Sequence, residues 1–217
     1  MSLSWKSYYK NNDNYYNKIS RLYRKIFFAS EGKIYTDKHF LEEGFFVECG
    51  SGTSECSVMI QKKKRYGIAV DIRVEPLRRV HAPIMESLVQ GTIFNLPFKD
   101  GTVNGIWNFG VMEHFKENDL KLILKEFNRT LSDDGKIVLF WPWAYSPLSL
   151  FFILRGCANI VISKFGGKLP RIYPDAFTVF KNKSAIKNIL KDSGFSNSEF
   201  ELSPYGLFVH YVVIASK

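Results

Sequence analysis

The fold is set by residues 44–55, which read GFFVECGSGTSE. Residues 45–49 are apolar except for Glu48, which suits a buried strand, and they lead into Gly50 and Gly52. Glycines at the end of a strand let the backbone turn tightly and come close to a ligand. A helix that starts after such a turn directs free N–H groups toward that ligand. The stretch therefore predicts a strand, a ligand-binding turn and a helix.

Short apolar runs and helical stretches alternate after this turn. The expected strands are 45–49, 66–71, 105–108 and 136–141, and the expected helices are 55–64, 75–86, 119–130 (capped by Asp119) and 184–192. Such alternation indicates a parallel sheet with helices on both faces. Strands 198–202 and 207–215 follow, and the turn between them is too short for a parallel crossover. We therefore expect the sheet to finish with an antiparallel hairpin.

Two segments lie outside this pattern. Residues 1–40 contain apolar side chains at helical spacing, which predicts a helical cap over a main domain of residues 41–217. Residues 143–180 fit no sheet element, and a long insertion of this kind is expected to be a lid or substrate-binding segment. Its apolar part, 148–162, contains Arg155 and Asn159 and is shorter than the roughly 20 residues of a membrane span. No transmembrane segment is expected.

The composition is that of one globular protein, with 217 residues, 46% hydrophobic and 24% charged. The net charge of +9 predicts either an anionic partner or simply a solvated basic face. The three cysteines, Cys49, Cys56 and Cys157, have neither disulfide-framework nor metal-ligand spacing. We therefore expect a cytoplasmic protein without a metal site.

The charged residues around the glycine turn indicate the kind of ligand. Asp71 ends the next strand about 20 residues later, where a carboxylate can accept hydrogen bonds from ribose hydroxyls. A dinucleotide-binding turn needs a third glycine at position 55, which is Glu55, and a pyrophosphate would lie unfavourably beside Glu55 and Glu48. The sequence therefore favours a cationic nucleoside without phosphate.

Residues 46–54 and 70–71 resemble the class I S-adenosylmethionine-dependent methyltransferases. Segments 95–103, 107–114 and 126–136 are similar to the small-molecule branch of that family, which is related to ubiquinone and sterol methyltransferases. The resemblance covers residues 44–142. It implies a Rossmann-like three-layer α/β sandwich with a mostly parallel seven-stranded sheet and an antiparallel last strand.

The resemblance also implies a set of cofactor-binding residues. The methionine end of S-adenosylmethionine is expected at Glu48, Gly50, Ser51 and Gly52. The ribose is expected at Asp71 and the adenine at Ile72, Thr92 and Ile93, where Thr92 replaces an aspartate that the family often has. The floor beneath the sulfonium is expected at Asn108, Phe109 and Gly110.

The expected reaction is direct transfer of the methyl group to an O, N or C nucleophile of a small molecule, with S-adenosylhomocysteine as product. His114 is a candidate general base for a hydroxyl acceptor, and a purely structural role is its alternative. The basic, partly apolar insertion suits an anionic, lipid-linked or sugar-linked substrate. Two alternatives stay open, namely a nucleic-acid methyltransferase and a non-catalytic binding protein on the same fold. The sequence does not indicate an oligomeric state.

Overall fold

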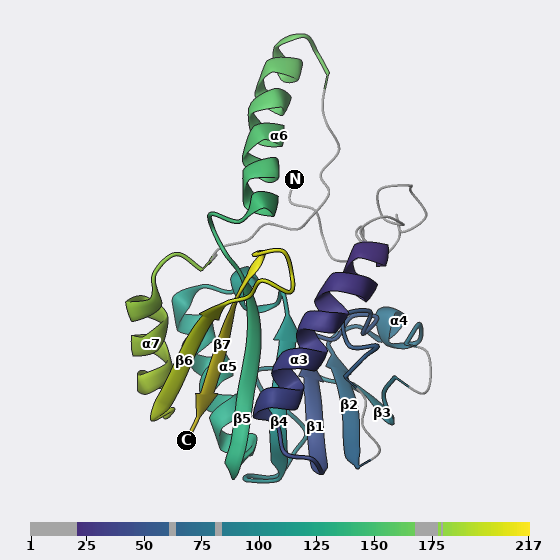
Figure 1. Cartoon of the computed structure of the whole chain (residues 1–217), viewed down its shortest axis with the longest axis vertical. Helices are drawn as coiled ribbons and strands as arrows, with labels where there is room; N and C mark the ends of the chain where they lie inside the picture. The colour runs from purple at the N-terminus through teal and green to yellow at the C-terminus, as the bar shows by residue number, and fades with distance from the viewer. Residues whose placement is uncertain (1–20, 61–63, 81–83, 168–177, 179) are drawn as a thin grey trace.

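The structure is a computed structural model that describes residues 21–60, 64–80, 84–167, 178 and 180–217. Its centre is a seven-stranded sheet in the order β3-β2-β1-β4-β5-β7-β6 (Figure 1). The strands are β1 Gly44–Cys49, β2 Arg65–Asp71, β3 Ser87–Gln90, β4 Val103–Phe109, β5 Leu131–Pro142, β6 Asn197–Leu202 and β7 His210–Ser216. The first five are parallel, whereas β7 is antiparallel to both β5 and β6. The expected parallel sheet with a closing antiparallel hairpin is confirmed.

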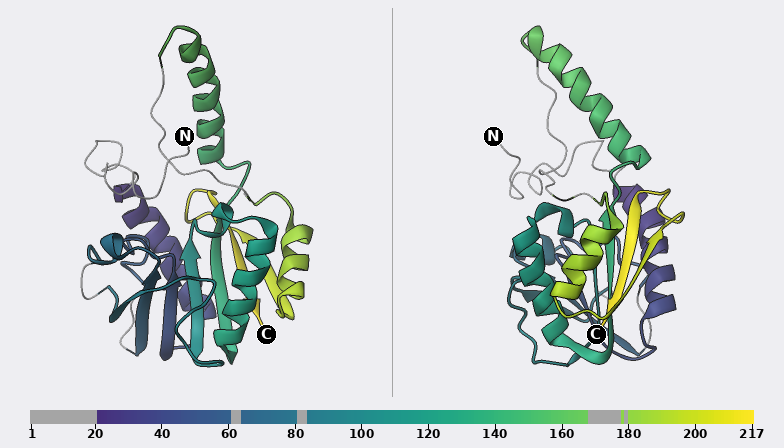
Figure 2. Two further views of the ribbon diagram at one scale, coloured as in Figure 1. Left: turned by 180° about the vertical axis from the view of Figure 1, so that it is seen from behind. Right: turned by 90° about the vertical axis from the view of Figure 1, so that its left-hand side faces the viewer.

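Helices cover both faces of this sheet. They are η1 Arg24–Phe28, α3 Ala29–His39, α4 Val74–Leu77, η2 Met112–His114, α5 Glu117–Thr130, α6 Pro147–Lys164 and α7 Lys183–Asp192. α3 and α4 lie on one face, and α5 and α7 lie on the other (Figures 1 and 2). Along β5, Val138 and Phe140 pack on the α3 side while Ile137 and Leu139 pack on the α5 side. This alternation is the period of two that a strand imposes, and it makes the three-layer sandwich.

Helix α5 follows its sequence pattern closely. Leu120, Ile123, Leu124 and Phe127 are fully buried, as their helical spacing predicts. The expected cap at Asp119 is wrong, because the N-cap is Lys116 and Asp119 lies inside the first turn. An acidic side chain there still favours the helix through its interaction with the helix dipole.

The expected helix 55–64 is wrong for its described residues, because Glu55 to Ile60 form successive turns. Ser57 explains this, since its hydroxyl donates to Glu48 Oε1 at 2.7 Å and accepts from Trp107 Nε1 at 3.0 Å. Ser54 has φ 52°, a left-handed conformation that a helix start cannot include. These buried tertiary contacts outweigh the local preference for a helix.

The expected helix 75–86 is also wrong in extent. α4 ends at Leu77, the described residues 84–86 are not helical, and the short edge strand β3 begins directly after them at Ser87. β3 pairs in parallel with residues 68–71 of β2, so its backbone groups bond to the sheet. In the last hairpin, β7 starts at His210 rather than at 207, because Leu207 and Phe208 have φ near 57°. Left-handed residues belong to the turn and cannot extend the strand.

The described part of the N-terminal region, residues 21–39, is helical throughout and includes the π-helix η1. Residues 1–20 of the expected cap lie outside the described residues, and the boundary at residue 40 stays a prediction. α3 packs closely on the end of β4, since a Cβ added at Gly32 would come within 2.8 Å of the Phe109 ring. Gly32 therefore lets the helix reach the edge of the sheet where the candidate site lies.

The insertion 143–180 contains α6. Ser146 caps this helix by accepting from the Ser149 N–H at 3.0 Å, and Pro147 occupies its first turn. α6 projects beyond the carboxyl ends of the parallel strands (Figure 1). Its length, its composition and a mean hydropathy of 1.3 would allow it to cross a membrane. The sequence expectation of no transmembrane segment, like that of a lid, stays a prediction.

Candidate active site

The turn after β1 brings the predicted glycines to the carboxyl edge of the sheet. Gly50 and Gly52 have φ 68° and 54°, a conformation that favours glycine. A Cβ added at Gly50 would also come within 2.8 Å of the Val111 side chain, so the turn touches the loop after β4. The N–H groups of Gly50 and Ser51 both donate to the Val70 carbonyl, which fixes the turn against β2.

Asp71 lies at the end of β2 and closes this turn. Its Oδ2 accepts from the Gly52 N–H at 2.8 Å, and its Oδ1 accepts from the Arg73 N–H at 2.9 Å. Burial raises the pKa of Asp71, and the same two N–H groups oppose that rise. Each carboxylate oxygen keeps a lone pair after these bonds, so Asp71 can still accept from two ligand hydroxyls.

Glu48 is buried beneath the turn and is 3% exposed. Its Oε1 accepts from Ser57, whereas its Oε2 accepts no hydrogen bond from the described residues. Burial raises the pKa of Glu48 to about 7, against the opposing effect of the Ser54 and Ser57 hydroxyls. A buried carboxylate with an unused oxygen is suited to pair with a cation.

The end of β4 forms the neighbouring part of the site. Asn108 is fully buried, and neither end of its amide has a hydrogen-bond partner among the described residues. Phe109 stacks on Phe140 with ring centroids 3.9 Å apart. Gly110, with φ 61°, donates its N–H to the Phe140 carbonyl at 3.1 Å. These three predicted residues thus form a rigid surface beside the turn of β1.

The three residues expected around adenine differ in their exposure and in their contacts. Ile72 is 67% exposed directly after Asp71, as an apolar residue that covers a flat ligand ring would be. Ile93 is buried in the core. The Thr92 hydroxyl accepts from the Phe94 N–H at 3.3 Å, so it helps to hold its own loop. Thr92 is uncharged, so it cannot supply the negative charge of the aspartate that the family often has at this position.

His114 lies in η2, four residues after Gly110. Its Nε2 is 3.7 Å from Glu113 Oε1, which is close enough for electrostatic interaction but too long for a hydrogen bond. Burial raises the pKa of Glu113 to about 8. The His114 side chain keeps 15% of its surface exposed, so a ligand at this edge can reach it.

Two sets of contacts between ionisable side chains near the site were not predicted. Glu31 of α3 contacts His210, with 2.8 Å between Glu31 Oε2 and His210 Nδ1, and both side chains are almost fully buried. The His210 ring also lies 6.1 Å from the ring of Phe109, which links the pair to the floor of the site. Because Glu31 and His210 are 179 residues apart, no local pattern could have indicated their contact.

The contacts of Glu55 correct the sequence-based inference that its charge would disfavour a pyrophosphate at this turn. Glu55 is held by Arg21 at 2.6 Å and by Arg24 at 3.2 Å. Its negative charge is therefore balanced, and it does not by itself exclude an anionic ligand from the turn. The absence of a third glycine, at the same position, still separates this turn from a dinucleotide-binding turn.

The unpartnered polar atoms test whether the site fits a nucleoside with an amino-acid tail. Among the described residues, five of the twelve buried side-chain atoms without a hydrogen-bond partner lie at this edge: Glu48 Oε2, Ser51 Oγ, Ser54 Oγ and both polar atoms of the Asn108 amide. Buried polar groups normally have partners, so such a cluster indicates a ligand site. An ammonium group would satisfy Glu48, and ribose hydroxyls would satisfy Asp71. These residues therefore fit S-adenosylmethionine.

Elsewhere in the described residues, cavities and potential metal ligands provide weaker candidates for a functional site. A cavity of about 20 Å³ lies between Phe46, Met85 and Trp107, away from this edge, and it has room for about one water molecule. Across the described ranges, no group of three His, Cys, Asp or Glu side chains is placed to hold a metal ion. The carboxyl edge of β1, β2 and β4 is therefore the candidate active site.

Comparison with solved structures agrees with this fold. An S-adenosylmethionine-dependent methyltransferase from Thermotoga maritima matches with a TM-score of 0.66 and 18% identity, over 99% of this chain and 100% of that one. Magnesium protoporphyrin IX methyltransferase from Synechocystis, solved with bound S-adenosylhomocysteine, matches with a TM-score of 0.64 and 12% identity, over 98% and 92%. The chain spans only 66% and 57% of two larger matched proteins, from Bordetella parapertussis and Nostoc punctiforme. No curated protein sequence matches this chain.

The fold and its edge site fit a nucleoside ligand, and a family comparison gives a likeness over part of the chain. Residues 47–139 match the model of a family described as "Methyltransferase domain". The matched range begins in β1 and ends in β5, so it includes the glycine turn, Asp71 and His114. This match covers less than half of the chain, so it shows a likeness to the family over residues 47–139, and the solved S-adenosylmethionine-dependent methyltransferases show that the chain shares their fold.

Proposed function

We propose that this protein transfers a methyl group from S-adenosylmethionine to a small amphipathic acceptor. The observation that carries the proposal is Glu48 Oε2, a buried carboxylate oxygen without a partner among the described residues, beneath the glycine turn and beside Asp71. When bound, S-adenosylmethionine supplies a methyl group whose carbon–sulfur bond breaks as the acceptor's lone pair bonds to carbon.

The chain's own residues then have the tasks of binding and orientation. Glu48 pairs with the ammonium group, Asp71 accepts from the ribose hydroxyls, and Ile72 covers the adenine. The rigid surface of Phe109 and Gly110 limits where the reacting groups can lie. Holding both reactants in one geometry is the main source of rate enhancement when the leaving group is already activated.

His114 is the candidate general base in this proposal. A hydroxyl acceptor must lose a proton as it attacks, and a neutral imidazole can take it. An amine that reacts through its free lone pair needs no such base, so the His114 role applies to hydroxyl acceptors.

Two observations support a small acceptor. The solved neighbour from Synechocystis is described as acting on magnesium protoporphyrin IX, a small amphipathic molecule. The exposed apolar helix α6 stands at the same edge of the sheet as the site (Figure 1). The basic surface leaves nucleic acid as the alternative acceptor, and the test below separates the two.

The test uses S-adenosylmethionine labelled in the methyl group, incubated with the protein and a cell extract. The products are divided into organic-soluble, water-soluble small-molecule and nuclease-sensitive fractions. The proposal predicts label in one of the small-molecule fractions, and loss of that label with Asp71→Ala. Label in the nuclease-sensitive fraction would contradict a small acceptor, and no label in any fraction would support a non-catalytic binding protein.

We also propose that the protein works in the cytoplasm. Cys49, Cys56 and Cys157 are all unpaired, and Cys157 is exposed. Free exposed thiols are typical of reducing compartments. Fractionation of cells that express the tagged chain tests this, and recovery from an oxidising compartment would contradict it.

A further inference from the structure

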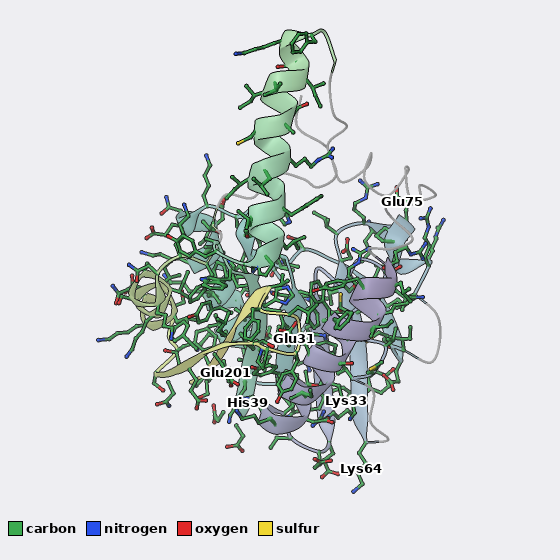
Figure 3. All side chains as sticks on the ribbon, turned by 45° about the horizontal axis from the view of Figure 1, so that its top comes forward. Glu31, Lys33, His39, Lys64, Glu75 and Glu201 are labelled. Carbon is green, nitrogen blue, oxygen red and sulfur yellow. The ribbon has the colours of Figure 1, made fainter. Side chains whose placement is uncertain are left out.

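Helix α6 exposes apolar side chains along its whole length. Six of them are between 50% and 63% exposed: Leu150, Phe151, Ile153, Leu154, Ile160 and Val161. Figures 2 and 3 show the helix standing away from the sheet, with its side chains directed outward. Exposed apolar surface of this extent marks a site of interaction with another protein or with a membrane.

The distribution of residues around the helix favours a membrane. Arg155, Asn159 and Ser163 are spaced four residues apart and so lie on one side. At 3.6 residues per turn, these six exposed apolar side chains occupy about 180° of the circumference. A helix that packs on one protein surface typically has an apolar stripe of about 100°. A lipid leaflet can surround a much wider face.

Charge and aromatic residues point to an anionic lipid surface. Residues 143–173 contain no Asp or Glu and carry Arg155, Lys164, Lys168 and Arg171. Basic residues beside an apolar segment are attracted to anionic headgroups. Tyr145 and Phe165, just outside the two ends of α6, are 72% and 86% exposed, and aromatic side chains favour the headgroup region. The same positive charge would oppose pairing of α6 with a second copy.

The attachment of the insertion limits how deeply α6 can enter. Trp143 pairs with Phe180 in a parallel bridge, and the Phe180 N–H donates to the Pro142 carbonyl at 2.8 Å. The insertion therefore leaves and re-enters the domain at adjacent positions. If α6 crossed a bilayer, the 13 or so residues after it would have to cross back, and these include Lys168 and Arg171. That is too short for a second helical span of about 20 residues.

We propose that α6 docks this protein on an anionic phospholipid membrane by inserting its apolar face into one leaflet. α6 follows β5 directly, so it rises from the same edge of the sheet as the Gly50 turn and Asp71. Docking therefore turns the candidate active site toward the lipid surface. The docking itself is independent of methyl transfer. That the acceptor reaches the site from the membrane rests on the proposed function.

The test measures flotation of the purified full chain with vesicles of phosphatidylcholine and phosphatidylglycerol in equal parts. Leu154→Glu is compared with Leu122→Glu, a matched control on the body of the protein in α5. The two leucines are 60% and 56% exposed, so neither change disturbs the core. We expect binding by the wild type and the control, and a decrease of roughly tenfold or more for Leu154→Glu. No binding by the wild type, or equal binding by both variants, would overturn the proposal.

Cys157 provides a direct probe of insertion. It is exposed on the apolar face of α6, whereas Cys49 and Cys56 are buried, so a polarity-sensitive thiol dye labels it selectively. The proposal predicts a blue shift of the dye and protection from iodide when these vesicles are added. Light scattering without lipid tests the alternative that a second copy of the chain covers the apolar face of α6. A dimer that Leu154→Glu converts to a monomer, with no spectral shift on adding vesicles, would assign the face to a second copy instead.

Discussion

The backbone N–H of Gly52 donates to Asp71 Oδ2 at 2.8 Å, and this bond joins the turn after β1 to the end of β2. The carboxylate that is expected to bind the ribose therefore also holds the glycine turn in place. Because the conformation of the glycine turn and the expected binding of the ribose both depend on Asp71, a change of this residue affects both. The predictions below separate the two.

Gly50→Ala should destabilise the protein more than Gly101→Ala. Both glycines have φ 68°, but a Cβ at Gly50 would come within 2.8 Å of Val111, whereas nothing lies within 4 Å at Gly101. The left-handed backbone alone costs an alanine about 1–2 kcal/mol. The close contact should add about 1–3 kcal/mol to the loss of unfolding free energy at Gly50.

Urea unfolding of both variants measures this difference. Cofactor affinity should fall for Gly50→Ala and stay at the wild-type value for Gly101→Ala. Equal losses of stability for the two variants would show that the turn does not touch the loop after β4 as described.

The affinity for S-adenosylmethionine should rise as pH rises through about 7. Burial raises the pKa of Glu48 to about 7, so this carboxyl group is partly protonated at neutral pH in the ligand-free protein. Pairing with an ammonium group requires the ionised form, so binding should release a proton. Calorimetry in two buffers of different ionisation enthalpy measures that release. A pH-independent affinity, unchanged by Glu48→Gln, would remove Glu48 from the site.

The raised pKa of Glu48 has the opposite effect on the stability of the ligand-free protein, which should fall as pH rises. The pKa of Glu48 is higher in the folded state than its ordinary value of 4.5. The folded protein therefore holds the proton more tightly between pH 4.5 and about 7, and stability falls as pH rises through that range. Glu48→Gln should flatten this fall, which urea midpoints at several pH values can detect.

His210→Ala should destabilise the fold strongly. It leaves Glu31 as a fully buried carboxylate without its partner at 2.8 Å. Leaving a buried hydrogen-bonding group without its partner costs about 1–3 kcal/mol, and more when that group is charged. On the same helix, the pair Lys33 and Asp37 is exposed (Figure 3), so Lys33→Ala should cost about 0.5 kcal/mol or less. Similar urea midpoints for the two variants would contradict the buried pair.

His114→Ala should slow methyl transfer to a hydroxyl acceptor by about 100-fold or more without changing cofactor affinity. His39→Ala is the control, since His39 ends α3 at the opposite edge of the sheet (Figure 3). A rate that His114→Ala leaves unchanged would assign His114 a structural role.

Much of the fold could be predicted because local and tertiary preferences agree there. β1, the glycine turn and β2 have the apolar runs, glycines and terminal aspartate that their positions require. α5 was predicted because its apolar spacing matches the side that faces the core. The helix expected at 55–64 failed because Ser57 bonds to Glu48 and Trp107, which are distant in sequence.

α6 could have been predicted from a signal that was available. Ser146 followed by Pro147 is a typical helix start, with the serine as N-cap and the proline in the first turn. Its apolar residues, spread widely around the helix, hid the amphipathic period that normally identifies a helix. The contact of Glu31 with His210 could not have been found this way, because only the packing of α3 on β7 brings them together.

Binding of S-adenosylmethionine at the Gly50 turn and Asp71 can be measured by calorimetry with this cofactor and with S-adenosylhomocysteine, on the wild type, Asp71→Ala and Asp133→Ala. The Asp133 carboxylate is fully exposed, so its variant controls for loss of charge alone. The account predicts that both ligands bind the wild type and Asp133→Ala, and that Asp71→Ala binds at least about tenfold more weakly, since a charged hydrogen-bond acceptor is lost. Binding of neither ligand to the folded wild type would contradict it.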